Sequence, residues 1–338
     1  MSKLNKTPIV FVNPDTDFFE QGLAFPEYLE KNFPSEAYDI IHIHFSFNLL
    51  PLSQFKKLLD YFKSIKKPIV WTVHSLKPQR IRNLEKGKYE KLLFRYADKL
   101  ITLTVGAKNW IENNWGRPHL PIEVIPAGYI ADPDEVRRLR RTCRKDKNLF
   151  TYLIGDFREN KEYIQSIINF LQCSSLKKAK LQLIFKPINL YEDKQYCKLK
   201  NQLLNFYQIV SNNRRIRIIS KPEISNKEIT RAFLKSHAII LPYKWGTHSG
   251  QIELAKDCGC HVVVSDVGFY QEQWDKITIY KVSDNEIREI PKRFTQALIE
   301  VYQKAPLKPI GSIRKLELKN IINRHINIYQ QLICKKKK

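Results

Sequence analysis

Short apolar strands alternate with helical segments along the chain, and this alternation restricts the fold more than any other feature of the sequence. Segments between the strands have helical periodicity, such as residues 53–65 and 162–172. Alternation of this kind predicts parallel sheets covered by helices. The predicted strands, rich in β-branched residues, are residues 8–12, 39–44, 68–73, 99–103, 122–125, 151–154, 181–185, 215–219, 237–241 and 261–264.

Two series of strands, separated by a polar stretch at residues 132–148, predict two doubly wound α/β domains that face a cleft. The stretch is the expected linker and has a helix start at Asp132-Pro133-Asp134. A length of 338 residues suits two domains, each with its own core. We expect the first domain at residues 1–140 and the second at residues 141–305. Residues 306–338 then contain a long amphipathic helix and a basic tail.

The charge of the chain predicts an anionic partner. Lys and Arg number 58 against 34 Asp and Glu, a formal net charge of +24. The basic residues are dense at residues 56–95 and 335–338, where they would suit an anionic membrane surface. No helix-turn-helix, RRM or zinc pattern occurs. We therefore expect no nucleic acid as partner, and keep a nucleic-acid-binding protein as the alternative.

The cysteines and the apolar segments exclude several classes of protein. The 6 cysteines form no C-x-x-C pair and no zinc-ligand spacing, so we expect neither a disulfide framework nor a metal. No apolar run reaches the roughly 18 to 20 residues of a membrane span, and the N-terminus has no signal-like apolar core. The expectation is a cytoplasmic protein, with peripheral contact to the inner face of a membrane as an option.

Parallel sheets bind ligands where their strands end, and the most informative strand end is the one at Leu241. Neither G-x-G-x-x-G nor G-x-x-x-x-G-K-[ST] occurs, which disfavours dehydrogenases and P-loop proteins. Glycines would let the loop backbone approach a ligand, and the helix that follows would attract an anion. Glu253, one turn into that helix, could accept hydrogen bonds from a ribose diol. The candidate ligand-binding residues are Gly246, Thr247, His248, Ser249, Gly250 and Glu253.

Two further strand ends carry candidate residues. Arg158 and Lys161 follow the strand at 151–154 and could neutralise phosphate oxygens without a metal. His74 follows the strand at 68–73 and could bind a sugar hydroxyl or stabilise charge in a transition state. Each of the three sites also has a purely structural interpretation: a glycine turn with a capped helix, a basic loop, and a packed histidine.

Taken in order, these motifs resemble the GT-B glycosyltransferases of the retaining family 4 type. The resemblance covers about residues 8–275 and implies two Rossmann-like domains, the first for the acceptor and the second for a nucleotide sugar. It also implies that a last helix, at about 306–332, crosses back onto the first domain. The motifs are W-T-V-H-S at 71–75, Y-A-D-K-L-I-T-L-T from Tyr96, V-I-P-A-G-Y from Val124, G-D-F-R-E-N-K at 155–161, and the segment from Leu241 to Gly268.

The resemblance implies transfer of a sugar from a nucleotide-diphosphate sugar to a hydroxyl of a glycan or lipid-linked glycan, with retention of configuration and no cofactor. Arg158 and Lys161 would hold the diphosphate, and Glu253 the ribose. His74 and the loop before Glu253 would contact the sugar. His74, Arg158 and Lys161 form the predicted catalytic set.

Two positions depart from the family pattern. Trp245 stands where the first of two glutamates usually contacts the donor sugar, so His248 or Trp245 is expected to take over that contact. In the first loop, Gly22 stands alone where the family has paired glycines. A sugar-nucleotide hydrolase or epimerase on the same fold is a further alternative.

Overall fold

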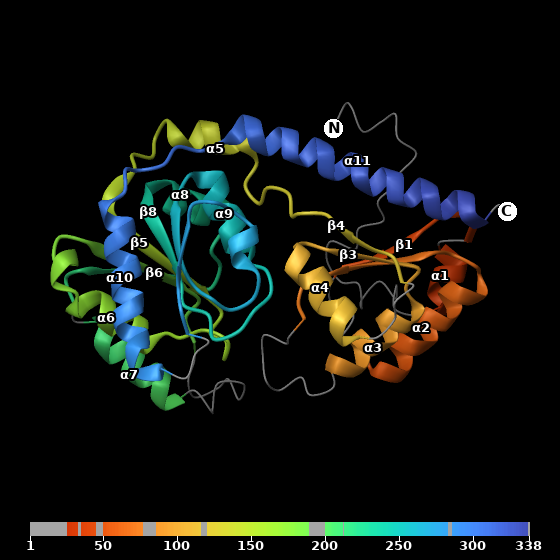
Figure 1. Cartoon of the computed structure of the whole chain (residues 1–338), viewed down its shortest axis with the longest axis horizontal. Helices are drawn as coiled ribbons and strands as arrows, with labels where there is room; N and C mark the ends of the chain where they lie inside the picture. The colour runs from red at the N-terminus through yellow and green to blue at the C-terminus, as the bar shows by residue number, and fades with distance from the viewer. Residues whose placement is uncertain are drawn as a thin grey trace.

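Two parallel sheets lie side by side beneath one long helix in the computed structural model of the chain (Figure 1). The expected strand at residues 8–12 and Gly22 lie outside the described residues. The structure describes residues 26–32, 35–44, 50–76, 86–115, 120–188, 200–211, 213–282 and 286–336.

The first sheet has the order β1-β2-β3-β4, and every described neighbour pairs in parallel. Its strands are β1 (Ile41–Ile43), β2 (Ile69–Val73), β3 (Lys99–Thr102) and β4 (Ile122–Val124). The helices of this part are α1 (Pro26–Asn32), η2 (Ser35–Ala37), α2 (Leu52–Ser64), α3 (Lys86–Tyr96) and α4 (Val105–Asn114).

The second sheet has the order β10-β9-β8-β5-β6-β7 and is also parallel. Counted from β5, this is the doubly wound order 3-2-1-4-5-6, whose switch point lies between β5 and β8. The strands are β5 (Asp146–Gly155), β6 (Lys180–Phe185), β7 (Ile216–Ser220), β8 (Ser236–Leu241), β9 (His261–Ser265) and β10 (Ile277–Tyr280). The helices are α5 (Pro133–Arg140), α6 (Ile164–Gln172), η4 (Ser174–Leu176), α7 (Lys200–Ser211), α8 (Asn226–Lys235), α9 (Gly250–Cys258), η6 (Tyr270–Glu272), η7 (Ile287–Glu289), α10 (Ile290–Gln303) and α11 (Gly311–Lys336).

Strand alternation divides the core of the second sheet into two layers. Ala238 and Ile240 of β8 pack with α6, α7 and α10. Ile239 and Leu241 of the same strand pack with α5, α8 and α9 on the opposite face. Helices therefore cover both faces, as the sequence predicted, and the switch-point loops emerge at one edge.

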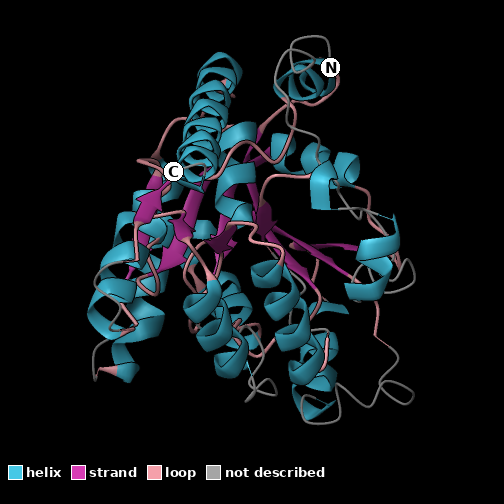
Figure 2. Cartoon of the chain, turned by 90° about the vertical axis from the view of Figure 1, so that its right-hand side faces the viewer, coloured by secondary structure: helices cyan, strands magenta, loops and turns pink. Residues whose placement is uncertain are grey.

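Helix α11 runs over both sheets (Figures 1 and 2). Near its C-terminal end, Ile328 is buried against Val70, Ile101 and Ile125 of the first part. At its beginning, Lys315 Nζ donates to the Asp134 carboxylate at 2.7 and 2.8 Å. Among the described helices, α11 included, none combines the length and the apolar character needed to cross a bilayer.

The described strands fall where the sequence predicted them, with two differences. Strand β5 begins at Asp146 instead of residue 151, and β10 was not predicted. The polar stretch at 132–148 contains helix α5, and its expected start is confirmed, because the Asp132 carboxylate accepts hydrogen bonds from the backbone of Asp134 and Glu135.

Candidate functional site

The two predicted loops of the second sheet flank its switch point and are joined to each other. Lys161 and Tyr243 form an isolated antiparallel bridge. Lys244 N donates to Asn160 O at 2.8 Å. The structure therefore brings the loop after β5 and the loop after β8 together as one unit, at the place where open α/β sheets bind ligands.

Lys161 is a buried cation at the end of β5. Its side chain donates from Nζ to the carbonyl oxygens of Ile154 at 2.5 Å and Leu153 at 3.4 Å. Burial and then the charge of Arg158 lower the pKa of Lys161 to about 7. The residue is 7% exposed, so its ammonium acts in a water-poor environment, where an anion would be bound strongly.

Arg158 lies in the same loop but is more exposed than Lys161. Its Nη2 is 3.7 Å from Asp156 Oδ2, and its side chain is 36% exposed. Asp156 also lies 3.8 Å from Lys186 Nζ. Arg158 thus belongs to a surface ion-pair group, while Lys161 points to the strand end.

Helix α9 starts in a network of polar side chains. Ser249 N donates to Gln273 Oε1 at 2.9 Å, and Gln273 Nε2 donates back to Ser249 O at 3.0 Å. The Ser249 hydroxyl makes no capping bond and lies 3.2 Å from Tyr243 Oη. Gln273 therefore fixes the backbone from which the predicted donor helix begins.

Both oxygens of the Glu253 carboxylate are engaged inside the protein. Oε2 accepts from Arg314 Nη2 at 2.9 Å, and Oε1 accepts from Gln273 Nε2 at 2.9 Å. His248 Nε2 lies 3.4 Å from Oε1, at the limit of a hydrogen bond. Burial raises the pKa of Glu253, but the contacts with His248, Gln273 and Arg314 outweigh it and hold the pKa below its ordinary value. A ribose diol would have to displace Gln273 or His248 from Oε1.

His74, after β2, belongs to a cluster of histidines at the edge of the first sheet. Its Nε2 lies 3.2 Å from His44 Nδ1, because the parallel neighbours β1 and β2 end at the same edge. His42 is fixed by Thr72 Oγ1 at 2.8 Å and by Tyr329 Oη of α11 at 2.6 Å. Burial lowers the pKa of His74 to about 3 and that of His42 to about 2, so both are neutral at pH 7.

Because His42 and His74 stay neutral in the folded protein, we expect the free energy of unfolding to fall as the pH drops from about 6.5 to 5. The unfolded chain takes up protons at His42 in this range while the folded chain does not. His42→Asn should reduce the slope by about 1 kcal/mol per pH unit. Urea unfolding at pH 7.5, 6.0 and 5.0 measures it. Equal slopes in the two proteins would show that His42 titrates normally in the fold.

Loops that follow strands of the first sheet contact loops that follow strands β8 and β9 of the second sheet. Leu76 N, two residues after His74, donates to Thr247 Oγ1 at 2.9 Å. Nearby, the Glu272 carboxylate accepts from the backbone of Val105 and Gly106 at the start of α4, at 2.6 and 2.8 Å. His74 and Thr247, predicted from distant motifs, therefore lie at one junction.

The two glycines predicted to lie near the ligand, Gly246 and Gly250, have different surroundings. A Cβ on Gly246 would lie 1.7 Å from Tyr270 Oη, whereas the nearest atom to a Cβ on Gly250 is Ile130 Cδ1 at 3.9 Å. Gly246 was expected to leave room for a ligand. The structure shows that this room is filled by the buried Tyr270.

Gly246→Ala is therefore expected to destabilise the protein by about 1–3 kcal/mol, because Tyr270 is packed and cannot move aside. Gly250→Ala, at the first position of α9, should change stability by less than about 0.5 kcal/mol. Urea unfolding of both variants gives the comparison. A Gly246→Ala protein as stable as wild type would mean that the loop adjusts.

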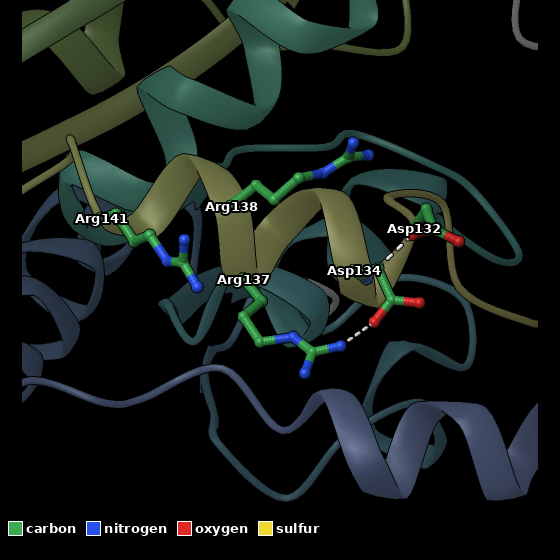
Figure 3. Close-up of a pocket in the computed structure, with 5 residues that line it drawn as sticks. All are labelled: Asp132, Asp134, Arg137, Arg138 and Arg141. Atoms are coloured by element: carbon green, nitrogen blue, oxygen red, sulfur yellow. Dashed lines mark hydrogen bonds and ion pairs between the residues drawn. The ribbon is translucent and has the colours of Figure 1, made fainter.

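An open groove of about 610 Å³ lies on α5, apart from the predicted site (Figure 3). Arg137 turns toward Asp134 and forms an ion pair with it (Figure 3). The lining residues are Asp132, Asp134, Arg137, Arg138 and Arg141. Since none of the predicted site residues lines it, the groove is no part of the candidate donor site.

Sequence reasoning missed three residues that shape the site. Gln273 and Arg314 lie outside the quoted motifs, and no local pattern connects them to Glu253. His44 could have been found, because it ends the alternating I-H-I-H segment at 41–44. That segment pairs with β2, the strand that His74 follows. Metal binding stays untested: within the described residues no three His, Cys, Asp or Glu side chains are grouped to hold an ion.

Comparison with known proteins agrees with this arrangement. Residues 4–132 match the model of Glycosyltransferase Family 4. A trehalose-phosphate synthase (UDP-forming) from Burkholderia xenovorans, solved with glucose-6-phosphate, is 14% identical with a TM-score of 0.62, over 91% of this chain and 75% of that one. Sucrose-phosphate synthase from Thermosynechococcus elongatus is 16% identical with a TM-score of 0.60, over 97% and 82%.

Anabaena HepE in complex with UDP and glucose is 15% identical with a TM-score of 0.59, over 93% of this chain and 84% of that one. No curated protein matches the sequence. At these identities the solved structures establish the fold, and the family match covers the first domain. Residues 4–132 thus match the Glycosyltransferase Family 4 model, and the described part of the chain has the fold of these solved glycosyltransferases, in agreement with the predicted fold class.

Proposed function

We propose that this protein is a glycosyltransferase that moves a sugar from a nucleotide-diphosphate sugar to a hydroxyl of a glycan or lipid-linked glycan, with retention and without a metal. The observation that carries the proposal is the position of Lys161. It is a buried amine at the switch point, protonated below its lowered pKa of about 7, and it is joined through the Tyr243 bridge to the loop that leads into α9. A diphosphate is the ligand that such a cation and a helix start attract together.

In this proposal the catalytic set is His74, Arg158 and Lys161. Lys161 and Arg158 neutralise the charge that develops on the leaving diphosphate. The backbone N–H groups from Gly246 to Gly250, which lead into α9, supply further hydrogen-bond donors, apart from Ser249 N, which already donates to Gln273 Oε1. His74, neutral at pH 7, faces the transferred sugar from the first domain. The similarity to proteins solved with UDP, glucose or glucose-6-phosphate supports a nucleotide-sugar donor and a sugar acceptor.

A panel of UDP-, GDP-, ADP- and dTDP-glucose in a thermal-shift assay tests donor binding, because a ligand of the folded state raises the melting temperature. We expect at least one of the four to raise it. The anomeric configuration of the product, followed by NMR, tests retention, and activity in EDTA tests the metal. A panel without any shift would contradict the proposed donor class.

Product analysis separates the transferase from a hydrolase or epimerase on the same fold. We expect sugar-nucleotide turnover to depend on added acceptor. Cleavage at full rate without acceptor would establish the hydrolase instead.

We also propose peripheral binding to an anionic membrane, supported by the net charge of +24. Within the expected basic face at 56–95, Lys56 and Lys63 are paired with Asp60 and Asp98, so these two contribute less than the sequence implied. Vesicle sedimentation with anionic and neutral lipids tests the proposal, and equal binding to both would overturn it.

A further inference from the structure

Two amide side chains of the candidate donor site carry an oxygen that has no hydrogen-bond partner. Among the described residues, nothing donates to Asn160 Oδ1 or to Gln251 Oε1, and both atoms are buried. Such an atom costs about 1–3 kcal/mol when neither protein nor water satisfies it. The two atoms lie on opposite sides of the switch point, one before Lys161 and one in the first turn of α9.

The orientation of the Asn160 amide follows from its surroundings. Its Nδ2 donates to Trp245 O at 3.3 Å, and a carbonyl oxygen can only accept, so the Oδ1 atom cannot take that place. The backbone is fixed as well, since Asn160 O accepts from Lys244 N at 2.8 Å. With the residue 4% exposed, Asn160 presents a preorganised acceptor between the two loops.

The same argument applies to Gln251. Its Nε2 donates to Leu153 O at 3.0 Å. Lys161 Nζ donates to that same carbonyl at 3.4 Å. The side chains of Gln251 and Lys161 therefore meet at the Leu153 carbonyl near the end of β5, and the Gln251 oxygen is left as an acceptor without a hydrogen-bond donor.

We propose that Asn160 and Gln251 bind hydroxyl groups of the nucleotide sugar, those of its ribose or those of its transferred sugar. The inference rests on the proposed function. A carbonyl oxygen needs an O–H or N–H donor, which a sugar supplies and an ionised phosphate does not. Lys161 would then bind the diphosphate, and the two amide oxygens would accept hydrogen bonds from hydroxyl groups.

The segment from Gly246 to Ser249 must move for this contact to form, while the bonds of Lys244 and Trp245 to Asn160 stay in place. Both amide oxygens are closed off from solvent, and Thr247 is attached to Leu76 of the first domain. Separation of that contact would let the loop lift, and a bound hydroxyl would then satisfy the amide oxygens when it closes.

The test compares Gln251→Met and Asn160→Leu with wild type, and uses Gln54→Met as the matched control. Gln54 also has a buried amide atom without a partner, its Nε2, but it lies on α2 of the first domain. Titration calorimetry with UDP-glucose, or with the member of the panel that wild type binds best, measures affinity. We expect Gln251→Met and Asn160→Leu to bind the donor about tenfold more weakly than wild type, and Gln54→Met to bind it as tightly as wild type.

The melting temperature without ligand separates a binding role from a structural one. Each variant removes an unsatisfied oxygen together with one hydrogen bond to a backbone carbonyl, so the two effects offset each other and the melting temperature should change little, whereas loss of a mainly structural residue would lower it clearly. Titration with UDP alone distinguishes the two sources of hydroxyl groups. A variant that binds UDP more weakly than wild type indicates a contact with the ribose. A variant that binds UDP normally but UDP-glucose more weakly indicates a contact with the transferred sugar.

Wild-type affinity for the donor in both Gln251→Met and Asn160→Leu overturns the inference and leaves the proposed function intact. A wild-type protein that binds no member of the panel overturns both. Because Asn160 lies in the loop after β5 and Gln251 in helix α9, failure of one variant to fold leaves the other to decide.

Discussion

Arg314→Met is expected to lower the free energy of unfolding by about 3–5 kcal/mol, since it leaves buried carboxylates without their partner. Arg314 is 1% exposed. Its Nε donates to Asp257 Oδ1 at 2.6 Å and its Nη2 to Glu253 Oε2 and Gly128 O at 2.9 Å each. A further contact joins it to Glu317.

The control is Arg324→Met on the same helix. Arg324 pairs with Glu123, but the two side chains are 42% and 36% exposed, so the loss should stay below about 1 kcal/mol. Urea unfolding at pH 7 measures both. Adding Glu253→Gln and Asp257→Asn to Arg314→Met removes the unpaired charges and should restore part of the stability. Equal effects of the two single variants would contradict the buried network.

The Arg314 network also connects three segments that the site needs. Asp257 Oδ2 accepts from Ile130 N and Ala131 N, at 2.7 and 2.9 Å, in the segment that leads into α5. Arg314 itself belongs to α11, and Glu253 to α9. A single buried cluster therefore fixes helix α9 relative to the connection between the two parts of the chain.

The fold was predictable because strand and helix patterns are local. β8 shows this well: six buried residues, apolar from Ala238 to Leu241, precede a glycine-containing loop. β10 escaped because its four residues alternate between buried and half-buried and form an edge strand. Of helix α5 only the start at Asp132 was predictable, because the high charge of the stretch indicated a linker and masked Val136 and Leu139, which are buried on one side of the helix.

The site was predictable only as far as strand ends reveal it. His74, Lys161 and the start of α9 follow strands and could be found from that rule. The partners of Glu253 could not, because Gln273 and Arg314 lie 20 and 61 residues further along the chain. Their contacts depend on how α11 and the loop after β9 pack, which no local pattern encodes.

Lys161→Met is expected to reduce kcat/KM by about 10²–10³-fold while stability stays equal or rises. The ammonium would stabilise charge on the leaving diphosphate, and this stabilisation is large because the group is buried. In the fold the same charge is costly. The pKa of Lys161 is lowered to about 7, so the unfolded chain binds more protons between pH 7 and about 10, and stability rises with pH in that window. Lys161→Met should abolish this rise.

The pH dependence of activity gives the sharper test. Wild-type kcat/KM should fall as the pH rises through about 7, because the free enzyme loses the Lys161 proton. The residual activity of Lys161→Met should lack this limb. Lys186→Met is the matched control: its ammonium is exposed beside Asp156, near the end of the neighbouring strand β6, and its loss should leave rate and pH profile unchanged. An unaltered pH limb in Lys161→Met would assign the titration to another group and remove Lys161 from the catalytic set.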